Sequence, residues 1–268
     1  MLRAAHQVID GDPKILEDPL AIQLLGEASL EAIRAGDPLQ MPALRLARSA
    51  ILMGGRFVED QLRSAVLGGI RQYVLLGAGF DSFGYRQPGW ASDLRIIEVD
   101  HPASQQLKRE RLAAAGVTVP PNITFIPIDF EVTTLADGLA AGGFDARRAT
   151  FFAWRGVTQY LTGSAIEKTL RYVLSLPPSS GIALTFMLPE ALLGEELDAV
   201  RVLSEVGASF GEPWLSRFEP ARLIAWLREL GFSEVVHLTP ALARDRYFRG
   251  RTDALPAPSY EQVVSATV

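Results

Sequence analysis

From residue 72 onward, short apolar runs alternate with stretches that have helical periodicity. The apolar runs are nearly continuous, which is typical of strands in a parallel sheet whose two faces are both covered. They predict strands at 73–76, 94–99, 123–126, 150–153 and 182–186. The intervening stretches predict helices near 102–115, 131–141 and 164–176. Alternation of this kind indicates an α/β fold with a mostly parallel sheet.

The two ends of the chain have different patterns. Residues 1–68 are expected to be helical, with one periodic run starting at Asp18-Pro19 and a second covering about 44–67. A polar stretch rich in Gly and Pro covers 189–219, and a helix is predicted from Pro220 to Leu230, ending at Gly231. Two last strands are predicted at 232–238 and 260–268, with an antiparallel pair as one arrangement. Because no repeat or linker interrupts the chain, we expect one domain with four segments: 1–68, 69–188, 189–219 and 220–268.

Composition narrows the classes of function. The 268 residues include 26 Lys and Arg against 31 Asp and Glu, a net charge of −5, which argues against nucleic-acid binding. No apolar run reaches about 18 residues, so we expect no membrane span. Cysteine is absent, which excludes disulfides, thiolate nucleophiles and Cys-ligated metals. The first 12 residues lack a secretory pattern, and we expect a cytoplasmic protein.

A glycine-containing loop, Gly77-Ala78-Gly79-Phe80-Asp81, directly follows the first predicted strand. Ligands bind at this edge of an open α/β sheet, and glycines let the backbone approach them closely. The third glycine of a dinucleotide fingerprint is replaced by Ser82, and Asp81 would repel a pyrophosphate. The loop therefore favours a ligand with an ammonium group and no phosphate, such as S-adenosylmethionine. A plain turn is the alternative.

Acidic residues end the next two predicted strands. Glu98 and Asp100 share one face of the second strand, and Asp100 is the better placed to accept hydrogen bonds from a ribose diol. The third strand ends at Asp129-Phe130, where the carboxylate is expected to accept the adenine amine and the ring to border the purine. The alternative for Asp100 is a solvated loop acid. Three acids at three successive strand ends are a stronger signal than any one of them.

The most specific motifs are Leu-Gly-Ala-Gly-x-Asp at 76–81 and Glu-Val-Asp-x-Pro at 98–102. Further matching segments lie at 6–7, 18–21, 56–60, 72–86, 108, 129–130, 156–162, 211–214, 231–232 and 246–248. Through these segments, nearly the whole chain resembles the leucine carboxyl methyltransferase family, in particular a bacterial branch of S-adenosylmethionine-dependent enzymes. The resemblance implies a class I methyltransferase (Rossmann-like) fold with a mostly parallel seven-stranded sheet and an N-terminal helical cap. It also implies methyl transfer to the oxygen of a carboxylate or hydroxyl.

The resemblance also implies which residues and segments form the cofactor site. We assign cofactor binding to Arg56, Gly77, Ala78, Gly79, Asp81, Glu98, Asp100, Asp129, Phe130 and Arg155. Residues 69–188 would be the cofactor-binding core, 1–68 the cap, and 189–219 a lid or acceptor-side insertion. S-adenosyl-L-methionine is the expected cofactor, and no metal is expected.

Two positions depart from the family pattern. The family usually has an Arg for the methionine carboxylate where this chain has Gly54, and often a Glu for the methionine amine where it has Arg155. Our hypothesis is that Arg155 binds the carboxylate, since Arg–carboxylate contacts are readily bidentate, while Asp81 keeps the ammonium. Alternatively, Arg155 points to solvent or pairs with a carboxylate such as Glu190.

The acceptor is expected to be a small, partly apolar molecule. An ionised carboxylate needs no general base, whereas an alcohol or phenol is helped by one. Tyr160 and His101 are the catalytic candidates, with a buried aromatic and a structural loop histidine as the respective alternatives. Five large apolar side chains could line an apolar acceptor pocket or belong to the ordinary core, and the sequence favours neither: Met41, Met53, Met187, Phe210 and Trp214.

Other functions stay open at this point. No Ser-His-Asp order, metal-spaced His cluster or Lys-bearing phosphate loop is present, which weakens hydrolase, metalloenzyme and kinase interpretations. One alternative is a methyltransferase fold repurposed for cyclisation or elimination on an intermediate of secondary metabolism. Another is a cofactor-binding protein with a dead site. The sequence leaves the oligomeric state open.

Overall fold

The computed structural model describes residues 1–35, 38–129, 132–253 and 255–268. Within them, seven strands form one sheet in the order β3-β2-β1-β4-β5-β7-β6. Their bounds are Gln72–Leu76 (β1), Arg95–Asp100 (β2), Ile123–Pro127 (β3), Thr150–Trp154 (β4), Gly181–Met187 (β5), Glu234–Leu238 (β6) and Glu261–Thr267 (β7). Strands β1 to β5 pair in parallel, and β7 runs antiparallel to β5 and β6. The predicted mostly parallel, seven-stranded sheet is confirmed.

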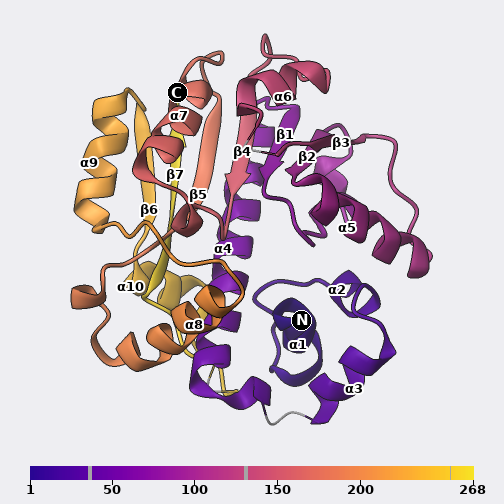
Figure 1. Ribbon diagram of the computed structural model, residues 1–268, viewed down its shortest axis with the longest axis vertical. Helices are drawn as coiled ribbons and strands as arrows, with labels where there is room; N and C mark the ends of the chain where they lie inside the picture. The colour runs from indigo at the N-terminus through magenta and orange to yellow at the C-terminus, as the bar shows by residue number, and fades with distance from the viewer. Residues whose placement is uncertain (36–37, 130–131, 254) are drawn as a thin grey trace.

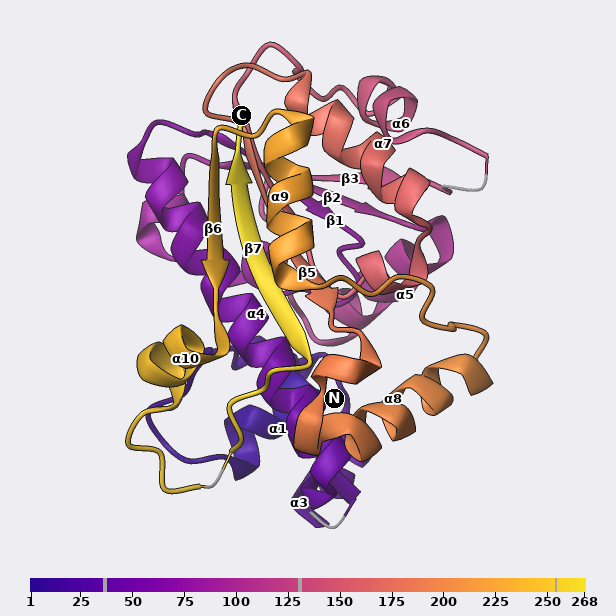
Figure 2. The ribbon, with the colours of Figure 1, turned by 90° about the vertical axis from the view of Figure 1, so that its left-hand side faces the viewer.

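Helices cover both faces of the sheet. The α-helices are Leu2–Ile9 (α1), Leu20–Gln23 (α2), Glu27–Ala35 (α3), Pro42–Leu67 (α4), Pro102–Ala114 (α5), Leu135–Ala141 (α6), Gly163–Leu174 (α7), Leu197–Ser209 (α8), Pro220–Leu230 (α9) and Pro240–Ala243 (α10). Short helical turns lie at Pro38–Gln40 (η1), Phe83–Tyr85 (η2), Gly89–Ala91 (η3), Thr158–Tyr160 (η4), Glu190–Leu192 (η5), Gly194–Glu196 (η6) and Arg244–Phe248 (η7). Helices α6, α7 and α9 pack on one face, and α4 packs on the other with η2 and η3. The long α4 runs diagonally along its face of the sheet, over β4, β5 and β7 (Figure 2).

The continuous apolar strands explain this double covering. Every residue of β1, β4 and β5 is buried, and side chains of opposite parity enter different cores. Val74 and Phe152 face the core under α6, α7 and α9, whereas Tyr73 and Phe151 face α4. A strand buried on both faces requires apolar residues at every position, as the sequence pattern indicates.

Two elements differ from the sequence-based expectation. Helix α6 begins at Leu135 rather than near residue 131, because the Thr134 side chain caps it by accepting from the Asp137 amide at 3.2 Å. The polar stretch 189–219, for which no helix is predicted, contains α8. Leu197, Val200 and Leu203 line one face of this helix and pack on the core, but the Gly and Pro residues around them favour a loop when the sequence is considered alone.

The N-terminal helices pack against the first half of α4. Arg48 of α4 makes a bidentate ion pair with Asp10 at 2.8 and 2.9 Å, and His6 contacts the same carboxylate at 2.9 Å. All three side chains are buried, and His6 also accepts from the Ile15 amide at 3.0 Å. His6 therefore holds the cap together. Because burial raises the pKa of Asp10 less than its hydrogen bonds to His6 and Arg48 lower it, that pKa lies below its usual value.

The carboxyl ends of the parallel strands point toward α1–α3 and α8 (Figures 1 and 2). The strand order reverses between β1 and β4, since β1 continues to β2 on one side while β4 continues to β5 on the other. This is the switch point at which open α/β sheets bind ligands. Within the described residues, no helix is long and apolar enough to cross a membrane.

Candidate functional site

The loop after β1 forms the floor of the site. The amides of Gly77 and Ala78 both donate to the Val99 carbonyl of β2, at 2.9 and 3.0 Å. Gly77 has φ of +67° and Gly79 has φ of +45°, in the left-handed region that favours glycine. These conformations turn the chain sharply at the sheet edge. The loop leads into the short turn η2 rather than into a full helix, so it lacks the helix N-terminus that a pyrophosphate uses.

Two cavities meet at this loop and share Leu76 and Gly77 in their walls. The first, of about 570 Å³, lies under the N-terminal segment and α8, and it reaches from Asp81 to Glu261. The second, of about 650 Å³, lies toward Asp100 and His101 and is walled on its far side by α6 and α7. They lie on either side of Gly77, at the carboxyl edge of β1. We refer to them as the loop cavity and the edge cavity.

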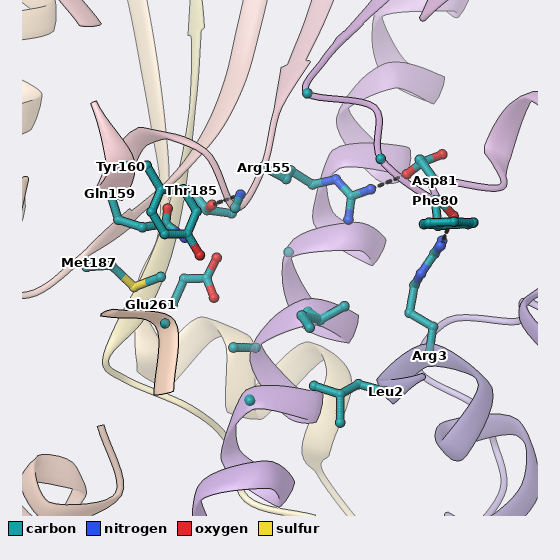
Figure 3. Close-up of a pocket in the computed structure, with 18 of the residues that line it drawn as sticks. Leu2, Arg3, Phe80, Asp81, Arg155, Gln159, Tyr160, Thr185, Met187 and Glu261 are labelled. Carbon is teal, nitrogen blue, oxygen red and sulfur yellow. Dashed lines mark hydrogen bonds and ion pairs between the residues drawn. The ribbon is translucent and has the colours of Figure 1, made fainter. Parts of the chain in front are cut away.

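Asp81 and Arg155 form an ion pair in the loop cavity, joining segments 74 positions apart (Figure 3). The Asp81 carboxylate also accepts from the Phe83 amide at 2.8 Å. Burial alone would raise the pKa of Asp81, but Arg155 and other nearby cations lower it to about 2. The carboxylate is therefore ionised at neutral pH. Arg155 neither points to solvent nor pairs with Glu190, which instead contacts Arg201 at 2.9 Å.

Helix α4 leaves room for the guanidinium of Arg155. A Cβ atom built on Gly55 would lie 3.1 Å from Arg155 Nη1, and one on Gly54 would lie 3.2 Å from Thr185. Side chains at these two positions would therefore crowd Arg155 and the cavity wall. Gly54 and Arg155, the two positions that depart from the family pattern, both line the loop cavity, whereas the close approach to Arg155 is made by Gly55.

The N-terminal segment closes one side of the loop cavity. Met1, Leu2 and Arg3 line it, and the Arg3 guanidinium donates to the Phe80 carbonyl of the loop (Figure 3). Arg3 also lies 2.9 Å from Asp18, which is fully buried. The helical cap is thus tied directly to the glycine loop.

The acids at the strand ends have different surroundings. Asp100 lines the edge cavity. Its carboxylate accepts hydrogen bonds from the Gly79 amide and, at 2.7 Å, from the backbone amide of His101. Glu98, which we expected at the cofactor, lines neither cavity. It is fully buried and bonds Lys108 of α5 at 2.6 Å. The strand alternation directs it beneath α5, where the ammonium compensates its charge.

Two further residues that we expected to bind the cofactor do not line the cavities. Asp129 follows β3 by two residues and lines neither cavity; its carboxylate lies 3.9 Å from Nε2 of His101, which borders the edge cavity. Phe130 lies outside the described residues. Arg56 lines neither cavity: its half-exposed side chain pairs with Asp60 one turn along α4, at 2.9 Å. A helix turns about 100° per residue, so Arg56 faces away from the wall that Gly54 forms.

The two catalytic candidates lie in different cavities. Tyr160, on η4, lines the loop cavity, whereas His101 lines the edge cavity and caps α5 by accepting from the Ala103 amide at 3.2 Å. Burial raises the pKa of Tyr160. Thr185 of β5 positions the segment that carries Tyr160, since it accepts from the Gly156 amide at 2.9 Å and its carbonyl accepts from Thr158 at 2.6 Å.

The candidate apolar residues divide between the pocket and other places. Met187 and Trp214 line the loop cavity, and the Trp214 ring stacks on Tyr260 with a centroid distance of 6.5 Å. Met53 belongs to a buried core cluster with Leu52 and Phe57. Met41 and Phe210 are exposed and do not line either cavity.

The model of the leucine carboxyl methyltransferase family matches residues 1–174. The chain belongs to this family. A relative in Bacillus subtilis strain 168, whose name (YktD) proposes it as an S-adenosyl-L-methionine-dependent methyltransferase, is 34% identical over 222 residues, covering 82% of this chain and 70% of the relative. A Mycobacterium tuberculosis H37Rv relative with a name of the same kind is 31% identical over 207 residues, covering 75% of this chain and 65% of the relative. The chain thus spans about two thirds of these relatives.

Solved structures share the fold of this family member. A DUF574 family protein from Streptomyces avermitilis has a TM-score of 0.57 and 19% identity, with 99% of this chain and 96% of that chain covered. A protein from Thermobifida fusca, whose title proposes that it is a methyltransferase, has the same TM-score and identity, and 91% of each chain is covered. These matches support the methyltransferase fold assigned above.

Several residues at the site were not among the sequence-based candidates. Gln159, Thr185, Tyr260 and Glu261 all line the loop cavity of this leucine carboxyl methyltransferase family member. Glu261 is the one acid in the strand Glu261–Thr267, a signal that could have marked it. Its position in the cavity depends on the antiparallel register that sets it opposite Met187. Among the described residues, no cluster of His, Asp or Glu is arranged to hold a metal ion.

Proposed function

We propose that this protein is an S-adenosylmethionine-dependent O-methyltransferase acting on a small, partly apolar molecule. The observation that carries the proposal is the Asp81–Arg155 ion pair at the glycine loop, beside a second cavity bordered by Asp100. Family membership supports methyl transfer. The names of the relatives support S-adenosylmethionine as the cofactor and give no support to a repurposed, non-methylating catalyst.

The charges in the loop cavity fit an amino acid end. Asp81 can accept an α-ammonium and Arg155 can donate to an α-carboxylate, so a zwitterion would exchange one internal ion pair for two external ones. Asp100, with its carboxylate at the edge cavity, is suited to a ribose diol. Residues of the edge cavity would then hold the adenosine, and residues of the loop cavity would hold the methionine portion.

The chemistry asked of the protein is positioning. The cofactor supplies a methyl group on a positively charged sulfur, and its transfer is a direct displacement. The loop and Arg155 would orient the donor, while Met187 and Trp214 provide an apolar wall for the acceptor. The N-terminal segment and α8 border the cavity and limit access of water. Tyr160, on the same wall, would orient an acceptor oxygen.

Calorimetry with S-adenosylmethionine and S-adenosylhomocysteine tests the cofactor assignment. Both are expected to bind, and Arg155→Gln is expected to weaken both by about tenfold through loss of a charged contact. Arg201→Gln is the matched control, because Arg201 pairs with Glu190 on the surface, outside both cavities. Failure of both ligands to bind the unmodified protein would refute the proposal. Transfer of a radiolabelled methyl group then separates an enzyme from a binding protein with a dead site.

A further inference from the structure

The end of the loop cavity farthest from Asp81 contains a buried carboxyl group. Glu261 opens β7 opposite Met187 of β5, lines the cavity and is 6% exposed. Thr185 of β5 lines the same cavity. Burial raises the pKa of Glu261, and this effect exceeds the opposing influence of Thr185 and Arg155. A carboxyl group with a raised pKa on a cavity wall is suited to accept a proton near neutral pH.

A polar side chain near Glu261 has an acceptor atom without a hydrogen-bond donor. Gln159 is 4% exposed and lines the cavity, and its Oε1 atom accepts no hydrogen bond from the described residues. Tyr160, the next residue, also lines the cavity. A buried acceptor without a donor costs about 1–3 kcal/mol, so it favours a ligand that brings one. An ionised carboxylate brings no donor, whereas a hydroxyl group does.

Positive charge lies at the opposite end. Among the described lining residues, the cationic groups are Arg3, Arg155 and the α-ammonium of Met1. Arg3 and Arg155 contact the Phe80 carbonyl and Asp81 respectively, and the ammonium interacts electrostatically with Arg3 and Asp18. Figure 3 shows Tyr160, Met187 and Glu261 on the other side of the cavity from Arg3 and Asp81. An anionic acceptor at the Glu261 end would therefore meet a like charge without a free cation to compensate it.

Resting on the proposed function, we propose that the acceptor is an uncharged alcohol or phenol and that Glu261 is the catalytic residue that accepts its proton. Gln159 and Tyr160 orient the hydroxyl group. Carboxylates are excluded by the charge of Glu261. The site is thus specific for ether formation rather than ester formation.

The step is balanced in atoms and charge. The hydroxyl oxygen forms a bond to the methyl carbon, the carbon–sulfur bond breaks, and its electron pair stays on sulfur. The hydroxyl proton passes to the Glu261 carboxylate. A sulfonium and a carboxylate thereby become a neutral thioether and a neutral carboxylic acid. Because a poorly solvated site penalises charge, the mutual neutralisation of these two groups favours the transfer.

The surroundings of Glu261 permit a pH test. Its charged or titratable neighbours are Arg155 after β4, Tyr160 on η4 and Tyr260 in the adjoining position. The lining residues of α4 and α8 beside the cavity carry no charge; they are Ala47, Ala50, Ile51, Gly54, Leu203 and Gly207. Burial raises the pKa of Glu261, so among these neighbours its carboxyl group is the one expected to take up a proton as the pH falls.

The test compares probes that differ only in their polar group. The protein is first saturated with S-adenosylhomocysteine, and binding of 3-phenylpropanol, 3-phenylpropanoate, 3-phenylpropylamine and 4-ethylphenol is measured by calorimetry at pH 8. A hydroxyl probe is expected to bind about tenfold tighter than the carboxylate. Glu261→Gln should strengthen carboxylate binding about fivefold while changing hydroxyl binding less than about threefold. Discrimination against the carboxylate should weaken as the pH falls.

Methyl transfer provides the second readout. Glu261→Gln should slow transfer to the best hydroxyl probe by about a hundredfold, the usual effect of losing a general base. Glu212→Gln is the matched control: this exposed acid influences Tyr160 electrostatically but does not line the cavity, so it should leave the rate unchanged. The inference is wrong if no hydroxyl probe binds, if the carboxylate or the amine binds more tightly, or if Glu261→Gln leaves selectivity and rate unaltered. Failure of S-adenosylhomocysteine to bind would instead count against the proposed function.

Discussion

Gly77→Ala tests the geometry at the centre of the site. A Cβ atom at this position would lie 2.5 Å from the Val157 Cγ2 atom, well inside van der Waals contact. The residue also has φ of +67°, a conformation that L side chains adopt only with strain. Left-handed strain costs about 1 kcal/mol and overpacking about 1–3 kcal/mol, so we expect a loss of about 3 kcal/mol in the free energy of unfolding.

Gly79→Ala is the matched control for that prediction. Gly79 has φ of +45°, but the nearest atom to its added Cβ is the Gly77 carbonyl oxygen at 4.0 Å. It has the backbone strain without the collision, so its expected loss is about 1 kcal/mol. Urea denaturation of both variants measures the difference, expected at about 2 kcal/mol.

A double-mutant cycle identifies the cause. Val157→Ala removes the Cγ2 atom, so Gly77→Ala should cost about 1–2 kcal/mol less in the Val157→Ala background than in the unmodified chain. Equal losses for Gly77→Ala and Gly79→Ala, or a cycle with no interaction energy, would refute the close approach of the loop to Val157.

Two further predictions concern buried charges. Lys108→Met leaves the fully buried Glu98 without its partner at 2.6 Å, and we expect the free energy of unfolding to fall by about 3–5 kcal/mol. Adding Glu98→Gln should restore much of that loss, because the buried charge is then removed. Urea denaturation measures both variants, and a double variant no more stable than Lys108→Met would contradict the pairing. The pKa of Asp81 is lowered to about 2 against a reference of 3.8, so its stabilising contribution is present above about pH 4 and is lost as the pH falls toward 2. The stability difference between the unmodified chain and Asp81→Asn should therefore shrink over that interval, and a pH-independent difference would argue against an ionised, paired Asp81.

Much of the fold follows from local pattern. The predicted strand at 73–76 became β1 at Gln72–Leu76, and the predicted helix from Pro220 to Leu230 is α9 without change. These elements have strong periodicity and clear end signals, a Pro at the start of α9 and Gly231 directly after it. Helix α8 was not predicted because the Gly and Pro residues around it favour a loop, and its packing partner α4 is far away in the sequence.

The candidate site could be predicted only in part from local sequence pattern. Residues that follow parallel strands are brought to one edge by the topology, which places Asp100 and the glycine loop together from pattern alone. Strand parity could not decide between Glu98 and Asp100, because both lie on one face. The distinction depends on Lys108, which α5 sets over Glu98 ten positions later.

The amino-acid sequence by itself determined the α/β class, the mostly parallel sheet and the acidic strand ends, since these depend on hydrophobic periodicity and on residues near one another in the chain. The tertiary structure alone decided that Arg155 meets Asp81 and that Glu261 enters the cavity. Those contacts join segments that are distant in sequence, and they depend on strand register, on helix packing and on the space that Gly55 leaves beside the guanidinium. Such contacts are set by how the elements pack, which no local pattern encodes.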